Sequence, residues 1–327
     1  MDQASLPPPP SRAETERCYR HPDVETGVHC TRCGNPICTA CMIPAPVGHQ
    51  CPDCVAQARR EFRKGPGRQI AIAEVKGVSV TKILLVAIAG MYLVEVVAGG
   101  AGSLLSGPGS RRLLQLGGQI ALAPSPEGPI GVATGQYWRL FTAMFLHGGL
   151  IHAGLNAWVL FVVGTALEHD IGRARFAGLY LVAGLFASAA SFALIDLDIT
   201  RTAAGVGVAP AVSVGASGAI FGLFGAFVAY NWRYRHRALA SARLRQILPW
   251  VFLNIVFSFS FPFIDWRAHM GGLVAGLVAG YAVADPARSA SANRLAAIAG
   301  IAGVLVAAVA LTAYGVMRIR DLVPEAF

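Results

Sequence analysis

The sequence has little charge. Only 14% of its 327 residues are charged, while 54% are hydrophobic, whereas a soluble globular domain carries roughly 25% charged residues. From about residue 78 onward, long apolar runs alternate with short basic or Gly/Pro-rich breaks. This shortage of charge excludes an ordinary soluble protein for most of the chain and predicts an all-α polytopic membrane protein.

The start of the chain lacks the apolar stretch of a signal peptide. Its first residues, MDQASLPPPPSRAETER, are rich in proline and predict a disordered tail over 1–17. An aromatic-interleaved basic face is also missing, so nucleic acid is not the expected partner despite the net charge of +9. We expect most of the basic residues to set the membrane topology instead.

Cysteine is absent from the hydrophobic part, because all seven cysteines lie between Cys18 and Cys54. An odd number at close spacing fits metal ligation better than disulfides. Four pairs of ligand-type residues have two-residue gaps, namely Cys18 with His21, Cys30 with Cys33, Cys38 with Cys41, and Cys51 with Cys54. Such a gap lets a tight turn present two ligands to one tetrahedral Zn²⁺. Residues 18–54 are therefore predicted to bind two structural zinc ions and to depend on them for folding.

The paired spacing resembles that of treble-clef, RING and B-box modules, which often interleave their ligands. That resemblance implies that the first and third pairs share one metal and the second and fourth pairs share the other. His29 and His49 lie outside the paired spacing and are expected to be surface histidines. The module is expected to cap the chain or to bind a cytosolic protein. Nucleic-acid binding stays open as an alternative because of nearby basic residues, Arg59, Arg60, Arg63 and Lys64.

Seven apolar segments are long enough to span a membrane, at about 79–99, 142–167, 175–195, 213–231, 247–264, 267–284 and 294–317. The second is long, and we expect its first few residues to belong to the preceding loop. The predicted organisation is a tail (1–17), a zinc-binding module (18–54), a basic linker (55–78), a membrane domain (79–318) and a second tail (319–327). With the N-terminus inside, twenty Lys and Arg lie on the inner side and seven on the outer side. This bias predicts a cytosolic zinc module and an outer C-terminus. Arg318 and Arg320 flank the last span on the outer side and oppose this orientation.

Polar residues within membrane spans are costly and usually functional. Ser217 lies in VSVGASGAIFGLFGAF, where Gly218, Gly222 and Gly225 could simply form a packing face. His269 begins a second glycine-faced segment, WRAHMGGLVAGLVAG. Two such helices can approach closely enough for the imidazole to take the proton of the serine hydroxyl. No Asp or Glu lies in the span of His269, so we expect a Ser-His dyad that needs no metal or other cofactor for catalysis.

A third segment supplies hydrogen-bond donors. His152 and Asn156 are four residues apart, so they share one helix face, and both can donate to a developing oxyanion alongside the Ser217 backbone N–H. His147 is expected to anchor the helix entry. Trp138-Arg139 precedes the span, where an aromatic-basic pair is expected at the lipid headgroups.

The ordered combination of Trp-Arg, His-x4-His-x3-Asn, Gly-Ala-Ser-Gly and Ala-His with a glycine stripe resembles the rhomboid intramembrane serine proteases over residues 79–285. The resemblance implies a six-helix core, to which a seventh span is added here. It implies Ser217 as nucleophile, His269 as base, an oxyanion hole of His152, Asn156 and the Ser217 amide, and a nucleophile loop with Gly215 and Gly218. Glu168 and Gly172 match a structural position of the family. Residues 100–141 would form a half-submerged first loop.

The sequence departs from the family pattern at Phe221, where many members carry a tyrosine that stacks on the base. A phenyl ring can still stack, but it lacks the hydroxyl. The resemblance implies an endopeptidase in a bacterial cell membrane that cleaves membrane-protein substrates, with its active site open to the outer face. Substrate would enter beside the fifth span, near FSFSFPFIDW. The alternatives are an inactive rhomboid-like scaffold for membrane clients and a transporter with a proton relay through His147, His152 and His269.

Overall fold

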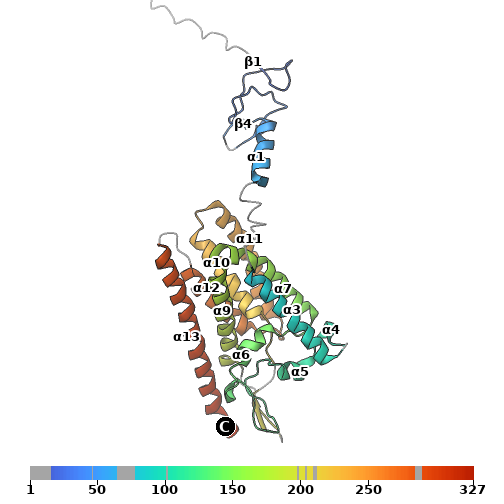
Figure 1. The fold of residues 1–327 in the computed structure, drawn as a ribbon, viewed down its shortest axis with the longest axis vertical. Helices are drawn as coiled ribbons and strands as arrows, with labels where there is room; N and C mark the ends of the chain where they lie inside the picture. The colour runs from blue at the N-terminus through green and yellow to red at the C-terminus, as the bar shows by residue number, and fades with distance from the viewer. Residues whose placement is uncertain are drawn as a thin grey trace, which may run out of the picture. The chain divides into compact units, whose positions relative to one another are not determined.

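The computed structural model describes residues 16–45, 47–64, 78–100, 102–196, 199–202, 205–208, 212–283 and 289–327. The chain divides into two compact units, Met1–Lys76 and Gly77–Phe327 (Figure 1). The predicted Pro-rich tail lies almost wholly outside the described residues, as does most of the predicted linker after Lys64.

The N-terminal unit is built from short elements around its cysteines. Strand β1 (Glu16–Arg17) pairs with β2 (Glu25–Thr26), and β3 (Ile43–Pro44) pairs with β4 (His49–Gln50), both antiparallel. Helix α1 (Pro52–Lys64) follows. The buried core consists of Ile37 and six of the cysteines, so the predicted metal ligands are also most of the hydrophobic interior. A core this small supports the expectation that bound metal supplies folding energy.

The second unit is a helical assembly (Figure 1). Its long helices are α3 (Val80–Gly99), α7 (Leu150–Val159) continued by the π-helical η3 (Leu160–Gly164) and α8 (Thr165–Ile171), α9 (Arg173–Ala193), α10 (Ser217–Arg233), α11 (Ala238–Ser260), α12 (Trp266–Val283) and α13 (Ala290–Leu322). A helix therefore lies at each of the seven predicted spans. Together they enclose one large apolar core, to which Phe176, Tyr180 and Leu223 contribute fully buried side chains.

Several helix boundaries differ from those expected from hydropathy. Helix α11 begins at Ala238 rather than near 247, and α13 extends to Leu322. The second long helix begins at Leu150, so the first residues of the segment 142–167 precede it, as expected. Within the described ranges, four helices are long and apolar enough to cross a membrane, namely Val80–Gly99, Leu150–Ile171, Arg173–Ala193 and Ala290–Leu322. Helix α10 has only 17 residues, and α11 and α12 include arginines. That these three helices span the membrane stays a prediction.

Glycines allow α10 and α12 to pack backbone against backbone. A Cβ at Gly276 would collide with the carbonyl oxygen of Gly222, and one at Gly272 would collide with that of Gly218. Backbone atoms cannot move aside as a flexible side chain can, so any larger residue would force the helices apart. The two predicted glycine stripes therefore face each other, and this contact sets the distance between the first turns of α10 and α12.

Glu168 caps the start of α3. Its carboxylate accepts hydrogen bonds from the backbone N–H groups of Val80 and Thr81 at 2.8 Å and from the hydroxyls of Ser79 and Thr81. The first N–H groups of a helix have no partner within the helix, and a carboxylate also suits the positive end of its dipole. Glu168 thus joins α8 to α3 across 87 residues of sequence, in line with the structural role that the family resemblance implies.

The segment between α3 and α7, expected to be irregular, contains short helices. They are α4 (Ser103–Ser106), α5 (Gly109–Gln115), η1 (Val132–Thr134), α6 (Arg139–Thr142) and η2 (Ala143–Phe145). Arg139 is buried and donates from Nη1 to the carbonyl oxygens of Leu114 and Gly118, both at 2.8 Å. It therefore holds this segment together, a role that the Trp-Arg pattern alone did not indicate.

Two further features were not expected from the sequence. Strands β5 (Ile199–Thr202) and β6 (Gly205–Val208) form an antiparallel hairpin between α9 and α10. Arg318 donates from Nη1 to the carbonyl oxygens of Ala193 and Ile195 at the end of α9, at 2.9 and 3.0 Å. Because a cation at a helix C-terminus is favourable, Arg318 has a local structural role, which weakens its value as evidence against the predicted orientation.

Candidate active site

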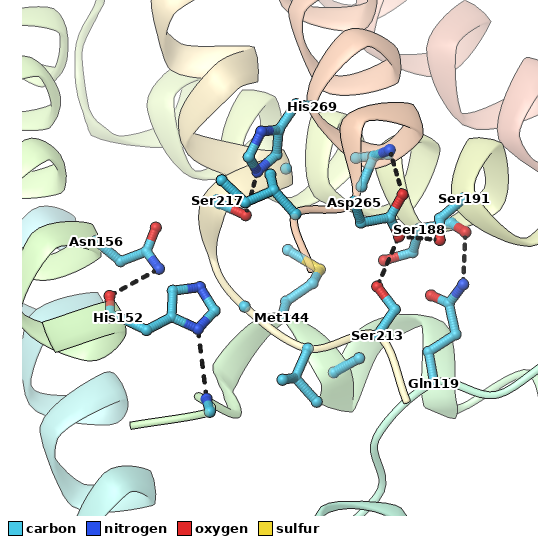
Figure 2. A pocket seen from close by; sticks show the side chains of 18 of the residues that line it. Gln119, Met144, His152, Asn156, Ser188, Ser191, Ser213, Ser217, Asp265 and His269 are labelled. Atoms are coloured by element: carbon cyan, nitrogen blue, oxygen red, sulfur yellow. Dashed lines mark hydrogen bonds between the residues drawn. The ribbon is translucent and has the colours of Figure 1, made fainter. Parts of the chain in front are cut away.

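The structure brings Ser217 and His269 together although 52 residues separate them. Ser217 is the first residue of α10, and His269 lies in the first turn of α12. The Ser217 Oγ is 2.8 Å from His269 Nε2, and Figure 2 shows this hydrogen bond as a dashed line. This is the distance at which an imidazole can take a hydroxyl proton, and the glycine contact between α10 and α12 is its cause.

Two side chains besides Ser217 hold the ring of His269. Its ring stacks on Phe221 with centroids 4.2 Å apart and planes 15° from parallel, so the phenyl ring does make the contact expected of the family tyrosine. Its Nδ1 is 2.7 Å from the hydroxyl of Ser258 in α11. The side chain is buried, at 9% exposure. Sequence reasoning missed Ser258, because a serine in an apolar segment shows no sign of the histidine it faces.

The loop before Ser217 fits closely against His152. Gly215 has a φ of 132°, which disfavours any residue with a side chain. A Cβ there would lie 2.9 Å from His152 Nε2 and 3.5 Å from Ser217 Oγ. The Gly215 N–H donates to the carbonyl oxygen of Ala143 at 2.9 Å. Glycine is therefore required at 215 both for the backbone and for the approach of the imidazole to the serine.

His152 and Asn156 lie on the side of Ser217 away from Asp265 (Figure 2). The backbone N–H of Gly148 donates to His152 Nδ1 at 3.4 Å, so the ring hydrogen lies on Nε2, which is next to Gly215. One hydrogen of the Asn156 amide bonds to the His152 carbonyl oxygen at 3.0 Å, and the other remains for a ligand. Both side chains can therefore donate a hydrogen bond near Ser217.

His147 is buried behind this group. Its backbone N–H donates to Glu95 Oε1 of α3 at 3.0 Å, and its Nδ1 is 3.2 Å from the carbonyl oxygen of Phe145. Its ring meets that of His152 edge-on at 5.1 Å. These contacts match the anchoring role expected for His147 at the entry to α7.

Asp265 links the nucleophile loop to the helix that carries His269. The sequence did not indicate this role. Its Oδ2 accepts hydrogen bonds from the hydroxyls of Ser213 at 2.8 Å and of Ser191 (Figure 2). Its Oδ1 accepts from the backbone N–H of Ala268 at 3.2 Å, in the first turn of α12. The Ser213 backbone pairs with Gln119 of the segment between α3 and α7. One carboxylate thus connects α9, α12 and the loop before Ser217.

These groups line a cleft of about 860 Å³. Met144, Leu155 and Phe224 contribute apolar walls, while His152, Ser217 and His269 contribute polar groups. A site of this volume, mainly apolar with a few convergent polar groups, can accept a short peptide segment.

The N-terminal unit contains two clusters of ligand atoms. Cys18, His21, Cys38 and Cys41 form one, and Cys30, Cys33, Cys51 and Cys54 form the other, with the ligand atoms of each within 4.8 Å of one another. These are the interleaved sets predicted from the four pairs. The His29 Nε2 instead bonds to Glu16 at 2.9 Å, and His49 belongs to neither cluster.

The geometry of both clusters fits a tetrahedral ion. Ligand atoms around Zn²⁺, with bonds of about 2.3 Å to sulfur and 2.0 Å to nitrogen, lie roughly 3.5–3.8 Å apart. Cys33 and Cys51 Sγ are 3.7 Å apart, and His21 Nδ1 lies 3.8, 3.3 and 3.4 Å from the sulfurs of Cys18, Cys38 and Cys41. The residues present therefore suit zinc in both clusters.

The thiols differ in acidity. Burial alone would raise the pKa of Cys18 and Cys30, but backbone N–H groups that donate to these sulfurs outweigh it and lower each pKa to about 6. Burial and neighbouring sulfurs raise the pKa of Cys41 to about 11 and that of Cys54 to about 12. A divalent cation deprotonates its thiol ligands, so it would let all the sulfurs in a cluster carry negative charge together.

A family of known proteins matches part of the membrane unit. The rhomboid domain family matches residues 134–286, a range that contains both Ser217 and His269. The Bacillus subtilis protein named "Putative rhomboid protease YdcA" is 32% identical over 149 residues, which are 46% of this chain and 68% of YdcA. The chain belongs to the rhomboid family. The family resemblance of the sequence is thereby confirmed, and with it a polytopic membrane protein.

Other rhomboid relatives share only part of their length with the chain. "Rhomboid protease GluP" of Bacillus subtilis is 36% identical over 164 residues, 50% of this chain but 29% of GluP. "RHOMBOID-like protein 5" of Arabidopsis thaliana is 36% identical over 154 residues, 46% of this chain and 45% of the relative. The matched rhomboid domain does not include residues 16–64.

Proposed function

We propose that this rhomboid protein is an intramembrane serine endopeptidase that cleaves membrane-protein substrates within or beside their transmembrane segments. The distance of 2.8 Å between Ser217 Oγ and His269 Nε2 carries the proposal. The membership of the chain in a family with relatives named as proteases supports it. The stacking of Phe221 on the base supports it further, because a held imidazole is a better oriented base.

In the proposed reaction, Ser217 Oγ attacks the substrate carbonyl carbon while His269 Nε2 takes the hydroxyl proton. The tetrahedral intermediate collapses when His269 returns that proton to the leaving amine, which breaks the peptide C–N bond and leaves an acyl ester on Ser217. A water molecule then attacks the ester carbonyl carbon while His269 takes one of its protons. The second intermediate collapses by breaking the bond between the acyl carbon and Ser217 Oγ, His269 returns the proton to Oγ, and the carboxyl product leaves.

The oxyanion of each intermediate is proposed to accept hydrogen bonds from the Ser217 backbone N–H, His152 Nε2 and Asn156 Nδ2. The Ser217 N–H is at a helix N-terminus, where it has no partner within the helix. Donors of this kind raise the rate because they meet charge that develops only in the transition state. Gly215 keeps the approach to these donors open.

The N-terminal unit is proposed to hold two structural zinc ions, one in each of its four-ligand clusters. Four protein ligands complete a tetrahedral zinc, so the module would stabilise the chain or bind a cytosolic protein rather than catalyse a reaction. We further propose that this unit lies in the cytosol and that the cleft opens to the outer face, on the basis of twenty inner against seven outer basic residues.

Cleavage of a model transmembrane substrate by the full chain in liposomes tests this function. We expect wild-type protein to cleave, Ser217→Ala to have no activity, and His269→Ala to lose at least about 10²-fold in kcat. Asn156→Ala is expected to lose up to about 10²-fold. If wild type fails to cleave a panel of such substrates while it retains them in pull-downs, the alternative of a client-binding scaffold is the better description.

A further inference from the structure

Ser258 of α11 lies behind the base, at the imidazole nitrogen that does not face Ser217. Its hydroxyl oxygen is 2.7 Å from His269 Nδ1 and 2.7 Å from the backbone carbonyl oxygen of Asn254. The side chain is only 2% exposed. Both contacts are therefore protected from water, in surroundings where a polar group without a partner is costly.

The two contacts fix the direction of both hydrogen bonds. A serine hydroxyl has a single hydrogen, and a carbonyl oxygen can only accept. The Ser258 O–H therefore donates to Asn254, as helical serines commonly do toward the residue four positions earlier. Its oxygen then accepts a hydrogen bond from His269 Nδ1–H. With the hydrogen on Nδ1, the His269 Nε2 presents its lone pair to Ser217 Oγ at 2.8 Å.

We propose that Ser258 is a positioning residue that holds His269 in the tautomer required of a general base; its effect on catalysis rests on the proposed function. In the opposite tautomer, Nε2 would carry the hydrogen and could not take the proton of Ser217. The imidazolium that forms during the reaction carries hydrogen on both nitrogens. Ser258 continues to accept from Nδ1–H in that state, so the contact needs no rearrangement.

A neutral hydroxyl suits this position in a membrane protein. Carboxylates orient the base in many serine proteases, but a buried charge without full compensation is costly. The bond from Ser258 to the Asn254 carbonyl oxygen makes the oxygen of Ser258 an acceptor without adding any charge. Ser217 and His269 thus remain the two reacting groups, and the uncharged Ser258 orients His269 without reacting.

Ser260 offers a matched control on the same helix. Its hydroxyl donates to the carbonyl oxygen of Val256 at 2.8 Å, again four residues earlier, but the side chain is exposed. Ser260→Ala therefore removes the same kind of hydrogen bond from α11 without touching His269. Ser258→Thr and Ser258→Val form a second pair, equal in shape but with and without the hydroxyl.

Kinetics of the full chain in detergent test the catalytic consequence. Ser258→Ala is expected to lower kcat about three- to tenfold, the usual worth of one hydrogen bond, with KM unchanged. Ser258→Thr should retain activity and Ser258→Val should not, while Ser260→Ala should match wild type. Equal kcat in Ser258→Ala and Ser260→Ala, with wild type active, would overturn the proposal and leave the protease function standing.

Nitrogen NMR of the histidines tests the tautomer without any turnover. In the full chain labelled with ¹⁵N-histidine, with the His269 signals assigned by their loss in His269→Ala, we expect a protonated Nδ1 and an unprotonated Nε2 at neutral pH. Ser258→Ala should shift both signals toward a mixture of tautomers. An unprotonated Nδ1 in wild type would contradict the proposal, even if the protein proved not to be a protease.

Discussion

The two units hold their functional side chains in different ways. In the N-terminal unit, the two ligands of each pair are only three positions apart in the sequence, and the ligands themselves form most of the buried core. In the membrane unit, Ser217 and His269 are 52 residues apart and meet because α10 and α12 pack through glycines. The arrangement of functional side chains should therefore depend on a bound ion in the first unit, and on the close approach of two helix backbones in the second.

Loss of one zinc ligand should have the largest effect. Cys30→Ser removes one of the four ligands of its cluster, so we expect the metal content of the full chain to fall from two zinc ions to one. The N-terminal unit should also lose much of its stability, because structural zinc contributes about 10–16 kcal/mol to the folding of small domains. Protease activity should remain near wild type. Metal analysis of purified protein, with the cleavage assay alongside, measures both.

His49→Ala is the control for this change, since His49 belongs to neither cluster. It should leave both zinc ions in place. Two zinc ions in Cys30→Ser would contradict the assigned ligand set. If Cys30→Ser lost proteolysis while its membrane unit unfolded like that of wild type, the two units would not function independently.

Gly276→Val should destabilise the membrane unit, because it changes the contact between α10 and α12 and leaves the metal ligands untouched. The added atoms would collide with the backbone of Gly222, so we expect a loss of more than about 3 kcal/mol in the free energy of unfolding and no proteolysis. Zinc content should not change. Gly303→Val in α13 is the matched control, because a Cβ there meets nothing within 4 Å. Equal unfolding temperatures for the two variants would refute the role of the glycine contact.

Asp265→Ala should have an intermediate effect. It removes the acceptor for Ser213, Ser191 and the Ala268 N–H, and hydrogen bonds to a charged group contribute about 1.5–3 kcal/mol. We expect a comparable loss in the free energy of unfolding together with a lower kcat, and a smaller loss in Asp265→Asn, which keeps one carbonyl acceptor. Asp321→Ala, at an exposed position, should have the same free energy of unfolding as wild type in denaturant titrations. If Asp265→Ala also had the wild-type free energy of unfolding, Asp265 would not connect α9, α12 and the loop before Ser217 as described.

Changes at Phe221 should be the smallest. Phe221→Leu removes the ring stacked on His269, and a contact of this kind is worth about 0.5–1.5 kcal/mol, so kcat should fall about two- to tenfold. Phe221→Tyr keeps the ring and should stay close to wild type in the same cleavage assay. A large gain in Phe221→Tyr would show that the missing hydroxyl limits this protein.

The difference between the units also decided what the sequence could predict. Ligand pairs with two residues between them are visible in the chain itself, and the resemblance to interleaved modules implied which pairs share a cluster, so both four-ligand sets were predicted before the structure. Ser217 and His269 were found because each begins a glycine stripe. Ser258 and Asp265 could not be found this way, because their roles depend on helices and loops that meet only in three dimensions.

The ends of the helices could not be predicted accurately from hydropathy alone. The predicted segment 142–167 begins at the end of α6 and contains η2, two short helices next to Arg139, whose guanidinium bonds to the preceding segment, and the long helix begins only at Leu150. The start of α11 at Ala238 was missed because Arg243 and Arg245 lower the local hydropathy, although Arg243 pairs with Asp170 at 2.6 Å. Charged residues that find a local partner can thus lie inside a long helix that an apolar pattern alone would cut short.

Labelling by a fluorophosphonate tests the central claim most directly, because the probe reports which serine is activated. The full chain in detergent is treated with the probe, digested, and the labelled residue is located by mass spectrometry. We predict a single labelled site at Ser217, with labelling abolished in Ser217→Ala and strongly reduced in His269→Ala. Labelling at a different serine, or equal labelling of Ser217 in His269→Ala, would contradict the account.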